Sequence, residues 1–342
     1  MEARPAAVCG TPAPVPGSGP GRTGRDSPGN RERPLREPFL VMMVGDAVVT
    51  RPVEVVMERS VLVGVDGSDE SLRSVEWAAA EAARRHCRLR TLTALPAPSP
   101  DAAFVWPEEE IRASARAVLD LAEERASAAA PGTAVDREVV MDSPGRALLE
   151  RAGQDGTALV VVGHRGRGGF SGLRVGSVAY RVAAQSSVPV VVVGPRPAAD
   201  ASAEVVVGDD GSARAERVVA EAFEAASTGG GPLRVVRVRE SALPFLPPAV
   251  ASSPRARESG PGDGLALERA VGPLRARYPE VEVRTEVVDG RPVAALTDAA
   301  RAARLLVVGA GGEHGLTRLA LGSAAHGVLH RSPCPVMVVH TG

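Results

Sequence analysis

The sequence contains the stretch Val61-Leu-Val-Gly-Val-Asp-Gly-Ser68, and 144 positions later it contains Val205-Val-Val-Gly-Asp-Asp-Gly-Ser212. In each copy an apolar run of the strand type ends in an Asp-Gly-Ser turn, and Ser is a favoured residue at the start of a helix. Two further landmarks, Gly163 and Gly176, recur 146 positions later. A solenoid unit spans only about 20–50 residues. The longer period therefore indicates a duplicated domain.

Each copy alternates apolar runs with amphipathic segments. In the first copy we expect strands near 60–65, 88–95, 135–140, 158–163 and 188–193, with helices from 69, from Pro107 to about 130, after Ser143-Pro144 and from Ser177. In the second copy we expect strands near 204–208, 233–239, 281–288, 304–308 and 335–339. Continuous Val runs are typical of strands covered on both faces, and helical crossovers make such strands parallel. The predicted fold class is α/β, with two tandem doubly wound domains, each built on a five-stranded parallel sheet.

We place the two domains at 59–196 and 203–342. Residues 1–58 are expected to be a disordered extension and linker, because 1–38 are dense in Pro, Gly, Ser and Arg and show no apolar period. Residues 39–58 are mixed and read as a loose strand or a linker. Met57 leads directly into the first core strand, which suggests the hypothesis that it is a true or alternative start. The segment 241–264 is expected to be mobile.

The composition excludes several classes of function. The net charge of −1 gives no basic excess for a nucleic-acid groove. The sequence contains no Lys, which excludes a P-loop NTPase and a Schiff-base enzyme. The three cysteines are far apart, as expected in a reducing compartment. The apolar run 39–45 is too short for a membrane span of about 20 residues. We therefore expect a cytoplasmic protein without nucleic-acid or membrane partners.

Two glycine-containing turns follow strands at the edge where α/β sheets bind ligands. The first is Asp66-Gly67-Ser68, whose carboxylate can bond a ribose hydroxyl or hold a metal at a phosphate. The second is Gly163-His164-Arg165-Gly166, followed after nine residues by Gly176-Ser177. The free N–H groups of a helix start make an anion site there, and the Ser177 hydroxyl adds a donor. Arg165 and Arg167 supply positive charge for phosphates.

Together these motifs resemble the ATP-binding subgroup of the universal stress protein family. The pattern Gly-x2-Gly-x9-Gly-Ser after a Val-rich strand, paired with Val-Gly-Val-Asp-Gly-Ser, covers about 60–195 and again 203–340. The resemblance implies an adenine nucleotide alpha hydrolase-like fold and ATP as the ligand, with or without Mg²⁺. In the first copy it implies binding by Asp66, Gly163, Gly166, Gly176, Ser177 and Val178, with Val140 near the adenine. The residue argument above adds Gly67, Ser68, His164, Arg165 and Arg167. In the second copy the implied residues are Asp210, Gly309, Gly312, Gly322, Ser323 and Ala324, with Val288 near the adenine. Asp66 and Asp210 are the carboxylates that could contact Mg²⁺.

The second copy departs from this pattern. Ala310-Gly311 replaces His164-Arg165, and Glu313 replaces Arg167, although Arg318 offers partial compensation. Asp209 adds a further carboxylate beside Asp210. Negative charges near a triphosphate lower its affinity. We predict that the first site binds ATP more tightly, and that the second is weakened or requires a divalent cation.

The resemblance also implies how the domains associate, because family members pair through the fifth strand. The apolar edges 188–193 and 336–340 would otherwise template aggregation. We predict that they pair antiparallel within the chain, about a pseudo-twofold axis. A homodimer of the whole chain is compatible with the resemblance, but no residue specifically favours it.

The function that the resemblance implies is an ATP-binding stress-response regulator that is not an enzyme. The alternatives are a slow ATPase, an adenylating enzyme of the PP-loop type, and an interaction scaffold that binds no nucleotide. The stretch 65–71 lacks the double Gly of a PP-loop, and no Gly-x-Gly-x-x-Gly follows either first strand as in a dinucleotide-binding dehydrogenase. In the scaffold alternative, the glycines only shape turns and Asp66 only caps a helix. His326 and His330 have zinc-ligand spacing but no evident third ligand, so we read them as packing or surface residues.

Overall fold

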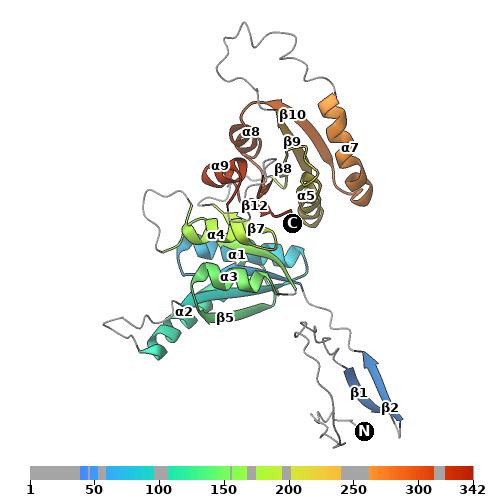
Figure 1. Ribbon diagram of the computed structural model, residues 1–342. Helices are drawn as coiled ribbons and strands as arrows, with labels where there is room; N and C mark the ends of the chain where they lie inside the picture. The colour runs from blue at the N-terminus through green and yellow to red at the C-terminus, as the bar shows by residue number, and fades with distance from the viewer. Residues whose placement is uncertain are drawn as a thin grey trace, which may run out of the picture. The chain divides into compact units, whose positions relative to one another are not determined.

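The computed structural model describes residues 39–44, 47–52, 59–95, 107–154, 156–167, 175–194, 202–239, 262–311 and 320–341 (Figure 1). The chain divides into two units, Met1–Val56 and Met57–Gly342. In the first unit, β1 (Phe39–Val44) pairs antiparallel with β2 (Ala47–Pro52). This part of the expected linker therefore contains two strands. The expected disorder of residues 1–38 concerns residues outside the described part of the chain.

The first domain of the second unit has the predicted alternation of strands and helices. Its strands are β3 (Ser60–Gly64), β4 (Arg88–Leu95), β5 (Val135–Met141), β6 (Thr157–Gly163) and β7 (Val190–Val193). Its helices are α1 (Asp69–Arg84), α2 (Glu108–Ala129), α3 (Pro144–Ala152) and α4 (Ser177–Gln185). The strands are parallel in the order β7-β6-β3-β4-β5. Ser68 caps α1 as predicted, since its Oγ accepts a hydrogen bond from the Ser71 N–H at 3.2 Å.

The second domain repeats this topology. Its strands are β8 (Val205–Asp209), β9 (Leu233–Arg239), β10 (Val283–Asp289), β11 (Leu305–Gly309) and β12 (Val336–Val339). Its helices are α5 (Ala215–Gly229), α7 (Gly262–Arg277), α8 (Pro292–Ala299) and α9 (Ser323–Arg331). The order β10-β9-β8-β11-β12 mirrors the first domain. Most of the segment expected to be mobile, 241–261, lies outside the described residues.

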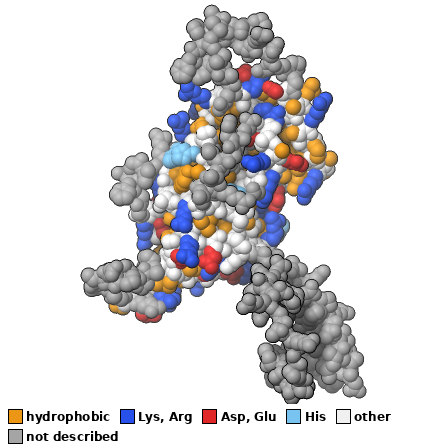
Figure 2. All heavy atoms as spheres, viewed as in Figure 1, with side chains coloured by type: hydrophobic (Ala, Val, Ile, Leu, Met, Phe, Trp, Pro, Cys, Tyr) orange, Lys and Arg blue, Asp and Glu red, His pale blue; other side chains and the backbone are white. Residues whose placement is uncertain are grey.

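Among the described residues the two domains share one ten-stranded sheet, because β7 and β12 pair antiparallel at its centre. The register places Val191 opposite Met337, and both side chains are fully buried. The predicted pairing of the two domains is confirmed. Helices cover both faces (Figure 1), with α1, α2, α5 and α7 on one and α3, α4, α8 and α9 on the other. On the surface in Figure 2, basic and acidic side chains are interspersed, in keeping with the small net charge.

Charged side chains lie at the contact between the domains on the α1 and α5 side. The carboxylate of Glu81 in α1 is fully buried. It accepts hydrogen bonds from Arg84 at 2.8 Å and Arg85 at 2.7 Å, and from Arg304 of the second domain at 3.3 Å. Burial alone would raise the pKa of Glu81, but the charges of Arg85 and Arg84 outweigh it and hold the pKa below its ordinary value. Arg85 also reaches Glu224 of α5 at 3.5 Å. We call these five residues the Glu81 cluster.

Candidate functional site

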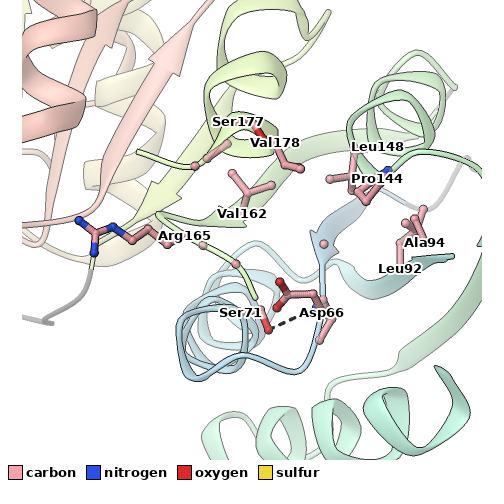
Figure 3. A pocket seen from close by; sticks show the side chains of 16 residues that line it. Asp66, Ser71, Leu92, Ala94, Pro144, Leu148, Val162, Arg165, Ser177 and Val178 are labelled. Carbon is pink, nitrogen blue, oxygen red and sulfur yellow. Dashed lines mark hydrogen bonds between the residues drawn. The ribbon is translucent and has the colours of Figure 1, made fainter. Parts of the chain in front are cut away.

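A cavity of about 440 Å³ opens at the carboxyl ends of β3, β4 and β6, beside the starts of α3 and α4 (Figure 3). The predicted residues that line it are Asp66, Gly163, Arg165, Gly166, Gly176, Ser177 and Val178. The predicted residues Gly67, Ser68, Val140, His164 and Arg167 are not among those that line it. The turn after β3 and the glycine-rich turn after β6 therefore meet at one cavity.

One wall of this cavity was not anticipated from the sequence. It is apolar and is formed by Leu92 and Ala94 of β4 with Pro144 and Leu148 of α3. In Figure 3 these four side chains lie on the side of the cavity opposite Arg165. A sequence signal did exist, because Leu92 and Ala94 stand two apart on a strand and so point to the same face. The predicted Val140 packs against the core on this face of the sheet.

The carboxylate of Asp66 joins the two turns. One oxygen accepts hydrogen bonds from the Ser68 hydroxyl at 2.6 Å and the Ser68 N–H at 3.0 Å. The other accepts the N–H of Arg167 at 2.8 Å. Burial would raise the pKa of Asp66, but the hydrogen bonds from Ser68 and Arg167 outweigh burial and hold the pKa below its ordinary value. Asp66 is therefore ionised at neutral pH and faces the glycine-rich turn.

Two glycines are required by this geometry. Gly67 has φ +78°, in the left-handed region that favours glycine. Gly166 lies so close to Asp66 that a Cβ there would overlap the carboxylate. The close approach of the two turns therefore depends on the absence of a side chain at Gly166.

The start of α4 is the polar end of the cavity. Gly176 is the N-cap residue of this helix and has no side chain to accept a hydrogen bond from the first N–H groups. Gly176, Ser177 and Val178 line the cavity, so the first turn of the helix borders it. Unpaired N–H groups and the positive end of the helix dipole favour an anion at such a position.

The two arginines of the turn are placed differently. The guanidinium of Arg167 lies beside Gly67, where a Cβ on Gly67 would be 2.7 Å from it. Arg165 begins at the cavity wall, but its guanidinium points away from Asp66 and Ser177 in Figure 3. In this conformation the stem of Arg165 forms the wall, and the predicted phosphate contact would require the side chain to turn.

His164 is turned toward the second domain. Its Nε2 is 3.2 Å from the carbonyl oxygen of Leu329 in α9. Burial lowers the pKa of His164, Arg165 and His330 lower it further, and the Leu329 carbonyl opposes the shift. The ring is therefore neutral at pH 7 and donates from Nε2. The predicted phosphate contact of His164 is not seen in this arrangement.

The second domain repeats part of the site. Gly309 ends β11, Gly322 and Ser323 begin α9, and Val288 packs on the same face of the sheet as Val140. Asp210 accepts the Ser212 N–H at 3.0 Å, as Asp66 does from Ser68. Ala324 lies in the first turn of α9. Gly312, Glu313 and Arg318 are outside the described residues.

One expectation about the second domain was wrong. Asp209 was expected to add negative charge to the site beside Asp210, but its side chain is 4% exposed and paired with Arg237 of β9. The Arg237 Nε donates to it at 2.7 Å. The charge of Asp209 is therefore neutralised, because the cross-strand position carries an Arg where the first domain has Thr93.

The remaining candidates for a metal site are His326 and His330, which have zinc-ligand spacing in the sequence. Within the described ranges, no group of three or more His, Cys, Asp or Glu side chains is suited to hold a metal ion. His326 lies edge-on to Tyr180 at 5.6 Å between ring centroids and 4.6 Å from the His330 ring.

In the part of the chain that the structure describes, no helix is both long and apolar enough to span a membrane.

Comparisons with known proteins agree on one family. The model of the universal stress protein family matches residues 57–194 and 203–340. A universal stress protein of Mycobacterium tuberculosis is 32% identical over 292 residues, which cover 82% of this chain and 97% of that protein. One of Mycolicibacterium smegmatis is 33% identical, covering 84% of this chain and 99% of that protein. The crystal structure of a universal stress protein from Archaeoglobus fulgidus matches with a TM-score of 0.62 and 21% identity, over 83% of this chain and 96% of that one.

Proposed function

The chain belongs to the universal stress protein family, with two tandem copies of the domain, and we propose that its first domain binds ATP and that the protein is a cytoplasmic stress-response regulator. The observation that carries the proposal is the Asp66 carboxylate, which accepts the Arg167 N–H and lines the cavity together with Gly166. A site that joins an ionised carboxylate, a helix start and an apolar wall matches the parts of a nucleotide.

Each part of ATP has a matching part of the cavity. The apolar wall of Leu92, Ala94, Pro144 and Leu148 suits the adenine ring. Asp66 suits a ribose hydroxyl or a Mg²⁺ ion at the phosphates. The start of α4 suits the phosphates themselves. A volume of about 440 Å³ falls in the usual range for small-molecule sites, about 300–1,000 Å³.

Binding without catalysis is the simpler interpretation of this arrangement. Although burial opposes the shift, the hydrogen bonds from Ser68 and Arg167 hold the pKa of Asp66 below its ordinary value, which makes the carboxylate a weak general base. His164, the other candidate base, is bonded to Leu329 and does not line the cavity. A single-turnover assay for ADP tests the alternative of a slow ATPase.

We also propose that the first domain is the tighter site. Because Arg237 neutralises Asp209, the difference between the two sites depends only on the loop after β11. In that loop Ala310-Gly311 replaces His164-Arg165, and Glu313 replaces Arg167. Titration calorimetry with ATP, with and without Mg²⁺, should show one tight site per chain. Ser177→Ala should weaken that site, whereas Ser323→Ala should leave it unchanged. Two equal sites without added metal would contradict the proposal.

The first test of nucleotide binding is a thermal unfolding experiment on the full chain. A ligand that binds only the folded state stabilises it by about 2.7 kcal/mol at about 100 times its Kd, so the Tm should rise with ATP. Gly166→Ala should abolish the rise, because the new methyl group overlaps the Asp66 carboxylate. Gly153→Ala is the matched control, since the nearest atoms to a Cβ there are 3.6 Å away. A wild-type chain purified without nucleotide whose Tm does not respond to ATP would support the scaffold alternative.

A further inference from the structure

His164 is bonded to three different elements of the structure. Its N–H donates to the Val193 carbonyl of β7 at 2.9 Å, and its own carbonyl accepts the Gly176 N–H at the start of α4 at 2.8 Å. Its ring reaches Leu329 of α9, in the second domain, at 3.2 Å. The residue that follows, Arg165, forms part of the cavity wall. His164 therefore connects the glycine-rich turn of the first domain to a helix of the second.

The Leu329 carbonyl needs a partner from outside its own helix. In an α-helix this carbonyl would accept the N–H of the residue four positions later, which is Pro333. Proline has no N–H, so that bond cannot form. The neighbouring carbonyl of Val328 does find a helical partner in the Ser332 N–H at 2.8 Å. The His164 ring therefore satisfies an acceptor that the sequence of α9 leaves unpaired.

On the other side of the pseudo-twofold axis the turn carries no histidine, and His340 of the second domain instead faces the backbone of Ala183 and Ala184 in α4. Ala310 stands at the position of His164 and makes the same two backbone bonds, to Val339 and Gly322, both at 2.8 Å. Its methyl group cannot donate a hydrogen bond. The backbone arrangement is thus common to both domains, and only the first has a side-chain donor at this position of the glycine-rich turn.

We propose that His164 is a positioning residue, through which the second domain holds the glycine-rich turn of the first in the form that binds nucleotide. The inference rests on the proposed function, and it gives the second domain a part in the first domain's site. Coupling between two sites is reciprocal. ATP bound in the first domain therefore also strengthens the contact of His164 with the end of α9.

The test compares full-length variants by titration calorimetry with ATP. His164→Ala should weaken ATP binding about five-fold, which corresponds to one hydrogen bond of about 1 kcal/mol. His164→Gln places an amide N–H near the Nε2 position and should retain most of the affinity, whereas the shorter His164→Asn should not. If the Ala variant does not fold, the ATP affinities of His164→Gln and His164→Asn are compared instead. His326→Ala is the control, because it removes the ring contact with Tyr180 between α4 and α9 without touching the turn.

A second measurement distinguishes positioning from a general loss of stability. At equal saturation, ATP should slow hydrogen exchange in the peptide 323–333 of the wild type but not of His164→Asn. Equal ATP affinity in the wild type and His164→Asn, or equal slowing of exchange, would overturn the inference and leave the proposed function standing. A wild-type chain that binds no ATP would overturn both.

Discussion

Replacing the buried Glu81 with Gln is expected to destabilise the folded chain, because it removes the only negative charge that Arg304 contacts among the described ion pairs. The Gln side chain has the same size but keeps one acceptor oxygen and adds an N–H₂ group that faces guanidinium groups. Arg85 and Arg304 have side chains only 4% and 15% exposed, so water cannot readily replace the lost carboxylate.

The size of the effect follows from this burial. Removing one partner of a buried ion pair costs about 3–5 kcal/mol. We expect a value near the lower end, about 3 kcal/mol, because Arg84 is 29% exposed and Arg85 retains Glu224. That loss is a large fraction of a typical unfolding free energy of about 5–15 kcal/mol.

Urea unfolding of the full chain, followed by circular dichroism at neutral pH, measures the change. The matched control is Glu76→Gln on the same helix, whose partner Arg125 is 48% exposed and 2.7 Å away. An exposed pair of this kind contributes about 0–1 kcal/mol. If Glu81→Gln costs no more than Glu76→Gln, the buried carboxylate of Glu81 does not stabilise the fold through Arg85 and Arg304.

Acidification should destabilise the protein through His164 and His340, because burial lowers both pKa values from 6.5 and the unfolded chain therefore binds more protons as the pH falls below about 6.5. The Tm measured from pH 7.5 to 5.5 should fall, and His164→Gln should make the fall smaller while the contribution of His340 remains. Met337→Ala, in the fully buried strand pair between the domains, should cost about 2–5 kcal/mol in urea unfolding. The same truncation at Leu265, which is 58% exposed, should cost less than about 0.5 kcal/mol. Ser68→Ala should remove the α1 cap at a cost of about 1 kcal/mol. It should also raise the pKa of Asp66, measured by carboxyl ¹³C NMR, and an unchanged pKa would contradict the hydrogen bonding described above.

The fold was predictable because its signals are local. Continuous Val runs indicate buried parallel strands, and both Asp-Gly-Ser turns follow such strands. The differences are also local in origin. β7 begins at Val190, later than predicted, directly after Pro189, whose nitrogen cannot donate to a strand. α5 begins at Ala215, later than the equivalent α1, and its start has no side-chain cap bond like that of Ser68. Ala215 also lacks the hydroxyl with which Ser71 donates to the Ser68 carbonyl.

The site was predictable only in part. The turns that carry Asp66 and Gly166 have a recognisable spacing, but the apolar wall depends on how α3 packs against β4. The direction of the Arg165 guanidinium and the pairing of Asp209 with Arg237 depend on which partner lies nearest in space. The bond from His164 to Leu329 joins residues 165 positions apart, in different domains. Its one sequence signal was Pro333, which leaves a helix carbonyl without a donor.

The antiparallel junction of β7 and β12 brings together two unlike halves that are linked by the chain itself. In an assembly of two identical subunits, every substitution would occur on both sides of the axis, and the assembly would weaken on dilution. Covalent linkage removes both constraints: His164 can face a proline-interrupted helix end on one side while Ala310 stands on the other, and this inequality persists at any protein concentration. A change that suits one half therefore need not be made in the other.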